Sequence, residues 1–341
     1  MKLVIRILFL VAAIILNGCN LKEIKRDRFY NRGNQAMEKN EYSEAIRLYE
    51  DALTIDPSFS KAWNNKGVAF KYQQKYKDAI IALDQAILYD PDMDQAYYNR
   101  ADANIRIGRY RLALNDLAIL ESWYPDTSVV HFLRGECYYY LKKYTESLQS
   151  FLTALAKDPD NEEILINMAV VYLDMESPAE VEKLLDQAEL LNAENADIYN
   201  VRSMFHMKKS QPERALLNIN KALSLNPLNP YFLNNKGYIL LMTDRLREAL
   251  ELIDRSLEAD PENKWVYRNK GIYYLKAGKY KEAERLLKKS SEMDPDLAEI
   301  NYYLGVLYVK LEDLDQACIY FKRSRELGED PAWKAVEIDC P

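Results

Sequence analysis

The sequence has little glycine, histidine or cysteine. Its 341 residues include 10 glycines, 2 histidines and 4 cysteines. Because glycine is scarce while leucine, alanine, glutamate and lysine are common, helix is favoured over sheet. The sequence contains no glycine-rich phosphate loop, no nucleophile elbow and no Cys-x-x-Cys pair. We therefore expect no catalytic centre, no cofactor and no metal site.

Positive charge is not in excess, and long apolar runs are missing after residue 19. The net charge of −7 argues against a nucleic-acid-binding protein, which would normally carry a basic face. No segment beyond Cys19 is apolar and long enough for a transmembrane helix, which needs about 20 residues. Hydrophobic residues still make up 48% of the chain, which is normal for a folded protein.

The first 19 residues read as a targeting segment. Lys2 and Arg6 precede an uninterrupted apolar run over residues 7–16, and Asn17-Gly18-Cys19 follows. This end resembles the bacterial lipobox, in which the cysteine is diacylated and becomes the new N-terminus. The resemblance implies a lipoprotein signal peptide over residues 1–18, and a lipidated N-terminus at Cys19 with a short linker over residues 19–25. The alternative is an ordinary secretion signal in which Cys19 is incidental.

From Arg26 onward the chain repeats with a period of 34 residues. Nine such units fill residues 26–331 without insertion or deletion. Position 8 of a unit is usually Gly or Ala, position 20 is usually Ala, and a proline recurs near the end. Small residues at positions 8 and 20 indicate two helices that approach closely. A single helical hairpin cannot bury its own apolar face, so the units must stack.

This pattern resembles the tetratricopeptide repeat (TPR). Position 4 is aromatic in Phe29, Trp63, Tyr97, Tyr199 and Tyr267, and position 17 is Tyr42, Tyr76, Tyr110, Tyr144 and Tyr280. The resemblance implies an all-α fold, a right-handed α-solenoid of about nine helix-turn-helix units with a concave groove lined by the first helices. We expect residues 332–341 to form a short C-terminal capping helix. Pro178 and Pro212 replace the usual tyrosine and are expected to start a second helix.

Asparagine recurs at position 6, which faces the groove in the TPR family. The six residues are Asn31, Asn65, Asn99, Asn167, Asn235 and Asn269. A side-chain amide both donates and accepts hydrogen bonds, so a row of them can grip an extended peptide backbone. This arrangement resembles the asparagine ladder of the repeat domain of O-GlcNAc transferase. The alternative is that these asparagines only support the scaffold.

Aromatic residues also occupy groove positions, where they are favoured interface anchors. They are Tyr98, Phe132, Tyr139, Tyr140, Tyr231, Tyr238, Trp265 and Tyr302. Any single one could instead pack between adjacent helices. Near the C-terminus, Cys318 and Cys340 could form a disulfide in an oxidising compartment, or could be two free thiols.

Taken together, the sequence predicts a membrane-anchored scaffold or adaptor of the bacterial cell envelope. It would bind other envelope proteins, through an extended or helical segment held in the groove, and attach to a membrane through acyl chains on Cys19. Asn20 after the lipidated cysteine does not resemble the inner-membrane retention signal, which favours the outer membrane. The alternative function is a carrier or receptor for a glycan or a small molecule.

Overall fold

The structure is a computed structural model that describes residues 21–328, and within this range every regular element is a helix. The chain divides at residue 167 into two compact halves, the N-terminal half and the C-terminal half. The predicted signal peptide, the lipid site at Cys19, Cys340 and the expected capping segment lie outside the described residues.

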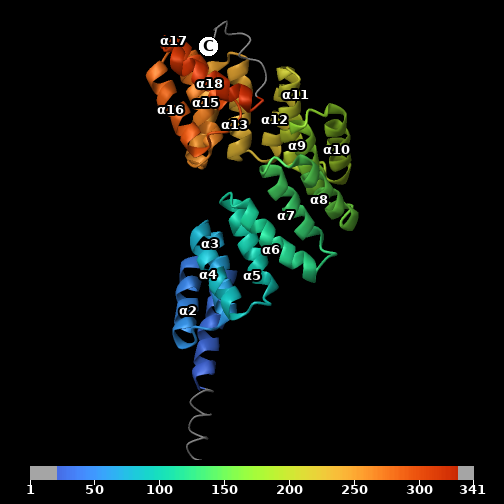
Figure 1. Cartoon of the computed structure of the whole chain (residues 1–341), viewed down its shortest axis with the longest axis vertical. Helices are drawn as coiled ribbons and strands as arrows, with labels where there is room; N and C mark the ends of the chain where they lie inside the picture. Colours follow the sequence, from blue (N-terminus) through green and yellow to red (C-terminus); the bar gives the residue numbers. More distant parts are fainter. Residues whose placement is uncertain (1–20, 329–341) are drawn as a thin grey trace, which may run out of the picture. The chain divides into compact units, whose positions relative to one another are not determined.

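The N-terminal half is a series of antiparallel helix pairs (Figure 1). Residues 21–38 are helical and pair with α2. The following helices are α2 (Tyr42–Ile55), α3 (Ser60–Tyr72), α4 (Tyr76–Tyr89), α5 (Asp94–Arg106), α6 (Tyr110–Trp123), α7 (Ser128–Tyr140) and α8 (Tyr144–Lys157). The division between the halves falls within α9 (Glu162–Asp174).

The C-terminal half continues the same pattern. Its helices are α10 (Pro178–Leu191), α11 (Ala196–Lys208), α12 (Pro212–Leu225), α13 (Pro230–Met242), α14 (Leu246–Ala259), α15 (Lys264–Lys276), α16 (Tyr280–Met293), α17 (Ile300–Lys310) and α18 (Leu314–Glu326). Pro178 and Pro212 are the first residues of α10 and α12, as the sequence predicts. Ser177 precedes Pro178 at the N-cap without a side-chain capping hydrogen bond.

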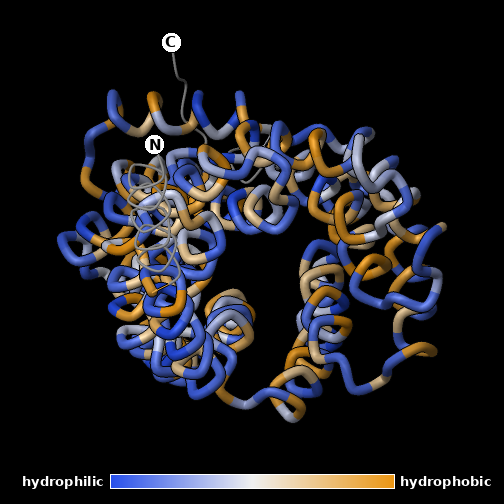
Figure 2. Tube along the Cα trace, turned by 90° about the horizontal axis from the view of Figure 1, so that it is seen from below, coloured by the Kyte–Doolittle hydropathy of each residue, from blue (hydrophilic) through white to orange (hydrophobic). Residues whose placement is uncertain are grey.

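These bounds confirm the 34-residue period and the all-α TPR-type solenoid fold. Each second helix, from α2 to α18, begins at position 17. Each first helix from α3 to α15 begins at position 1, and α17 begins two residues later, at position 3. Along the helices, hydrophobic and hydrophilic residues alternate in short segments, as Figure 2 shows, so each helix has one face that can be buried.

Position 8 is where the two helices of a repeat come closest. A Cβ built on Gly135 would lie 2.5 Å from the Phe151 ring, and one on Gly67 would lie 2.7 Å from Leu83 Cγ. The partner is always the large residue at position 24 of the same repeat. Real Cβ atoms do not approach so closely, so glycine at these positions lets a bulky side chain from the second helix rest on the first.

In five repeats, position 4 ties the start of the first helix to the turn before it. There its side chain contacts the backbone carbonyl six residues earlier, whereas the apolar Leu165 and Leu233 at the same position cannot make this bond. The pairs are Trp63 with Pro57 at 2.8 Å, His131 with Pro125 at 3.2 Å, Tyr199 with Ala193 at 2.9 Å, Tyr267 with Pro261 at 2.9 Å and Asn301 with Pro295 at 3.0 Å.

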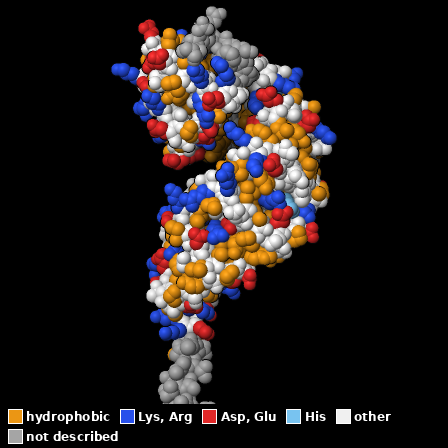
Figure 3. All heavy atoms as spheres, viewed as in Figure 1, with side chains coloured by type: hydrophobic (Ala, Val, Ile, Leu, Met, Phe, Trp, Pro, Cys, Tyr) orange, Lys and Arg blue, Asp and Glu red, His pale blue; other side chains and the backbone are white. Residues whose placement is uncertain are grey.

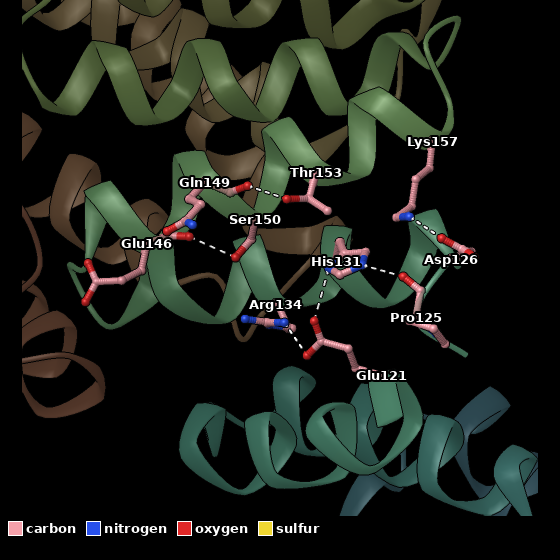
Figure 4. Close-up of polar contacts among 10 residues, drawn as sticks. All are labelled: Glu121, Pro125, Asp126, His131, Arg134, Glu146, Gln149, Ser150, Thr153 and Lys157. Carbon is pink, nitrogen blue, oxygen red and sulfur yellow. Dashed lines mark hydrogen bonds and ion pairs between the residues drawn. The ribbon is translucent and has the colours of Figure 1, made fainter. Parts of the chain in front are cut away.

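His131 shows this contact in detail. In Figure 4 its buried ring points toward the Pro125 carbonyl on one side and the Glu121 carboxylate on the other. The second contact, His131 Nδ1 to Glu121 Oε1, measures 3.7 Å, and Arg134 pairs with the same carboxylate. His131 therefore packs between α6 and α7 and links them.

Position 15, between the two helices of each repeat, has a left-handed backbone. Gly108 and Gly278 have φ of +74° and +72°, which glycine tolerates well. In the remaining repeats an L-residue takes this conformation, for example Gln74 at +59°, Lys142 at +57° and Glu176 at +56°. Each such residue costs about 1–2 kcal/mol relative to a right-handed conformation.

We predict opposite effects of two substitutions at this position. Glu176→Gly should stabilise the fold by about 0.5–1 kcal/mol because the strain is relieved. Gly278→Ala should destabilise it by about 1 kcal/mol, since the space around Gly278 is open and only the backbone opposes the change. Urea denaturation followed by circular dichroism measures both. As a control, Glu251→Gly within α14 should destabilise by about 1 kcal/mol; stabilisation there would contradict the interpretation.

Candidate partner-binding groove

The first helices of the N-terminal half form a cavity of about 400 Å³, here called the N-terminal cavity. Its lining comes from α3, α5, the end of α6 and the beginning of α7. Val68, Tyr98 and Val129 supply apolar surface, and the side chains of Asn65 and Asn99 supply amide groups. Tyr98 is 37% exposed and Val129 is 40% exposed. The cavity therefore offers both apolar contacts and hydrogen-bonding groups to a ligand.

The position-6 asparagines form a ladder of amide hydrogen bonds between neighbouring repeats. Asn99 Nδ2 donates to Asn64 Oδ1 at 3.1 Å. In the C-terminal half Asn235 Nδ2 donates to Asn200 Oδ1, and Asn269 Nδ2 donates to Asn234 Oδ1, both at 2.8 Å. Each bond joins position 6 of one repeat to position 5 of the repeat before it. We call this set the amide ladder.

The first rung of the amide ladder uses both donors of one side chain. Asn65 Nδ2 donates to the Tyr30 hydroxyl at 3.1 Å and to Asn34 Oδ1 at 3.0 Å. These contacts support the scaffold interpretation of the asparagines, because their amides already bind neighbouring repeats. A combined change of Asn65, Asn99 and Asn235 to alanine would remove contacts between repeats, so it tests folding together with binding.

The remaining two asparagines do not join the ladder. Asn31 is exposed beside a smaller hollow of about 280 Å³ that Tyr30 and Phe59 also line. Asn167 Nδ2 donates to the Glu163 carbonyl of its own helix at 2.9 Å. Of the six asparagines, Asn31 is the one that is exposed as a whole residue, and the role of the set in partner binding stays a prediction.

The predicted groove aromatics separate into exposed and packed side chains. Tyr98, Tyr140 and Tyr231 are exposed, whereas Phe132, Tyr139, Tyr238, Trp265 and Tyr302 are partly buried. Several pack between helices: the Tyr140 ring stacks on Tyr110 at 4.8 Å, Phe132 lies 5.7 Å from Phe151, and Tyr302 lies 6.2 Å from Phe321. Tyr98 combines exposure with a place in the N-terminal cavity, so it is the best-placed anchor.

Charged side chains of both signs are mixed across the surface, as the face drawn in Figure 3 shows. Beside the N-terminal cavity, Asp102 pairs with Lys71 at 2.6 Å and with Arg106 at 3.4 Å. Glu136, one repeat further along, is partly buried. Burial raises the pKa of its carboxyl to about 7; Arg106 opposes the rise, while Glu163 and Asp102 add to it.

The raised pKa of Glu136 gives a pH prediction. Between pH 4.5 and about 7 the folded state holds a proton that the unfolded state releases, so stability falls as pH rises through this window. We expect Glu136→Gln to unfold at a higher urea concentration than the native chain at pH 8, and at nearly the same concentration at pH 4.5. The Glu251→Gln variant, changed at an exposed glutamate of α14, should show no such pH-dependent difference.

The C-terminal half contains a second cluster, formed by Tyr238, Arg268 and Glu299. The Tyr238 hydroxyl donates to the Glu299 carboxylate, at 3.0 Å from Oε1 and 2.9 Å from Oε2. Arg268 Nη1 lies 3.5 Å from Glu299 Oε2. Sequence reasoning selected Tyr238 but missed the other two. Arg268 occupies position 5, where the amide ladder has Asn64 or Asn234. This replacement of asparagine by arginine is the sequence feature that could have indicated the cluster.

The remaining sequence expectations concern metals, membranes and cysteines. Residues 21–328 contain no group of three or more His, Cys, Asp or Glu side chains that could hold a metal ion, and no helix that could cross a membrane. Cys137 is buried, and burial raises the pKa of its thiol to about 12. Cys318 is 8% exposed on α18. Because Cys340 is not described, their pairing stays a prediction.

Sequence comparisons match the repeats directly. Family models described as tetratricopeptide repeat or TPR repeat match residues 33–74, 60–93, 105–162, 139–204, 231–296 and 274–337. These matches together cover well over half of the chain. No curated protein sequence shows a significant match.

Solved structures share the fold at low sequence identity. The human IFIT1 dimer with m7Gppp-AAAA has a TM-score of 0.62 and 16% identity, over 87% of this chain and 76% of that one. The Cut9–Hcn1 hetero-tetramer of the APC/C has a TM-score of 0.59 and 13% identity, over 91% and 74%. At these identities the likeness shows the helical repeat architecture alone.

Proposed function

The chain belongs to the tetratricopeptide repeat family, and we propose that it is a lipid-anchored adaptor of the bacterial cell envelope. Its groove would bind an extended or helical segment of another envelope protein. Membership of the family supports a protein-interaction scaffold. The anchor and the location rest on residues 1–19, whose sequence resembles a lipoprotein signal, and the outer membrane is the expected site.

The N-terminal cavity is the observation that carries the binding proposal. Its exposed Tyr98 and Val129 lie beside amide side chains, one of which, Asn99, also accepts a 3.0 Å hydrogen bond from Lys71. Apolar surface next to donors and acceptors suits a polypeptide, whose side chains need the first and whose backbone needs the second. Tyrosine is also among the residue types enriched at binding hot spots.

We predict that a photoreactive side chain at position 98 crosslinks a discrete partner in intact cells. Tyr98 is replaced by p-benzoylphenylalanine, the cells are irradiated, and the adducts are identified by mass spectrometry. The reason is proximity: a partner seated in the N-terminal cavity would lie against this ring. The same partner should also be crosslinked from position 129.

The matched control places the same photoreactive group at Ile81. This residue is 62% exposed on α4 and does not line the cavity. It should give no adduct with that partner. Equal crosslinking from positions 81 and 98, or a defined adduct from position 81 alone, would contradict binding in the groove.

We predict that Cys19 carries the membrane anchor. Each buried methylene of an acyl chain contributes about 0.8 kcal/mol, and more than one chain holds a protein stably at a bilayer. Cys19→Ala should therefore abolish incorporation of labelled palmitate and release the protein from the membrane fraction. Cys137→Ala, which changes a buried thiol, should keep both the label and the membrane fraction. A Cys19→Ala protein that still incorporates palmitate would refute the assignment.

A further inference from the structure

The first turn of α17 is distorted. The earlier first helices from α3 to α15 begin at position 1, but α17 begins at Ile300, position 3. Glu299 precedes it in a left-handed conformation, with φ of 62° and ψ of 0°. For an L-residue this costs about 1–2 kcal/mol. In the other eight repeats, left-handed residues occur at position 15 and not here.

The Glu299 carboxylate beside this distorted turn accepts hydrogen bonds from Tyr238 and forms an ion pair with Arg268. The Tyr238 hydroxyl reaches both carboxylate oxygens, at 2.9 and 3.0 Å, and Arg268 Nη1 lies 3.5 Å from one of them. Arg268 Nη1 also donates to the Ala298 carbonyl at 2.8 Å. The same guanidinium therefore holds both the side chain of Glu299 and the backbone just before it.

The guanidinium that receives the Glu299 carboxylate is buried and packed between aromatic rings. Arg268 is 6% exposed, and its guanidinium lies 4.9 Å from the Tyr238 ring centre and 5.0 Å from that of Trp265. Its Nε donates to Asn269 Oδ1 of the amide ladder at 3.0 Å. A buried guanidinium needs an anion nearby, and Glu299 is the only carboxylate within 4 Å of it among the described residues.

The two sides of this contact differ in exposure. The Arg268 side chain is 7% exposed, whereas that of Glu299 is 40% exposed. Burial, and then the Glu299 charge, raise the pKa of the Tyr238 hydroxyl, so the hydroxyl keeps its proton and donates. The site thus consists of the buried Arg268 on α15 and the partly buried Tyr238 on α13, and its occupant is a solvent-accessible carboxylate on a strained segment.

We propose that Tyr238 and Arg268 form a carboxylate-binding site for a partner segment, and that Glu299 is an internal occupant which this segment displaces. The inference rests on the proposed function, since it assumes that a protein segment enters the groove. The preferred segment carries one acidic residue flanked by apolar side chains, which would contact the aromatic rings beside the site. Trp265 lies against Arg268, and Tyr302, three residues after Glu299, is partly buried on α17.

Displacement has a structural consequence for α17. Once its carboxylate is replaced, Glu299 can return to a right-handed conformation, which relieves the strain. Ala298 and Glu299 can then join the helix, so that α17 begins at position 1 like the first helices from α3 to α15. Partner binding would be coupled to the ordering of one helical turn.

The test measures binding of short synthetic peptides to the full chain by calorimetry. The probe has blocked ends and a single glutamate between two leucines. We expect Glu299→Gly to bind it at least about tenfold more tightly than the native chain, because an intramolecular competitor at millimolar effective concentration is removed. Glycine accepts the left-handed backbone, so this variant also keeps the existing turn.

Three comparisons test whether any gain in peptide affinity comes from the site that Glu299 occupies. Glu251→Gln, at an exposed glutamate away from the site, should bind like the native chain. Adding Arg268→Met to Glu299→Gly should remove the gain, and a peptide with glutamine in place of glutamate should bind no variant tightly. A second probe, with a free C-terminal carboxylate and no acidic side chain, shows whether a chain end or a side chain is preferred.

Hydrogen exchange distinguishes a Glu299 contact that the peptide displaces from one that only supports the fold. Amide hydrogen exchange at residues 298–301 should slow when the glutamate peptide binds the native chain, because α17 gains a turn. Equal affinity of the native chain and Glu299→Gly, tight binding that survives Arg268→Met, or no binding by any variant would each overturn the proposal. None of these outcomes bears on crosslinking from Tyr98, which tests the proposed function in the N-terminal half.

Discussion

The fold depends on the close approach of the two helices within each repeat. At position 8 a residue without a Cβ, or with a small side chain, lets the large residue at position 24 lie on the first helix, as Gly135 and Phe151 show. Where position 8 is Ser203, its hydroxyl instead donates to the Ala215 carbonyl at 2.9 Å, so the short distance is kept by a hydrogen bond. With this contact in place, the apolar faces of neighbouring hairpins can meet and bury each other.

Two further rules follow from the same spacing. In five repeats the position-4 side chain contacts the carbonyl six residues earlier, and tryptophan, histidine, tyrosine and asparagine all do so. Position 15 needs a left-handed backbone, which the chain accepts even at Glu176 and Lys142. Side-chain identity is therefore restricted by packing at positions 8 and 24. Position 4 accepts both hydrogen-bonding and apolar residues, and position 15 is restricted by backbone geometry, which several residue types satisfy.

Much of the architecture could be predicted because it is periodic. The recurrence of Gly67 and Gly237 at the same position predicted the 34-residue period and the close approach of two helices in each unit. The groove was less predictable, because the same asparagine can face a ligand or a neighbouring repeat. Asn99 and Asn269 donate to the preceding repeat, and no single-residue pattern distinguishes the two roles. The contact of Glu299 with Tyr238 spans 61 residues and follows from a departure from the repeat, which periodicity cannot reveal.

Each hydrogen bond of the amide ladder connects only two neighbouring repeats. Each rung joins position 6 of one repeat to position 5 or 9 of the repeat before it. The bond therefore depends on the repeat position and not on which repeat supplies it. If residues 60–93 were excised, Asn99 would take the register that Asn65 now holds, facing Tyr30 and Asn34. Loss of this one 34-residue segment therefore leaves a donor–acceptor pairing at the new junction. At this junction the array can lose one repeat without a compensating substitution in the rung.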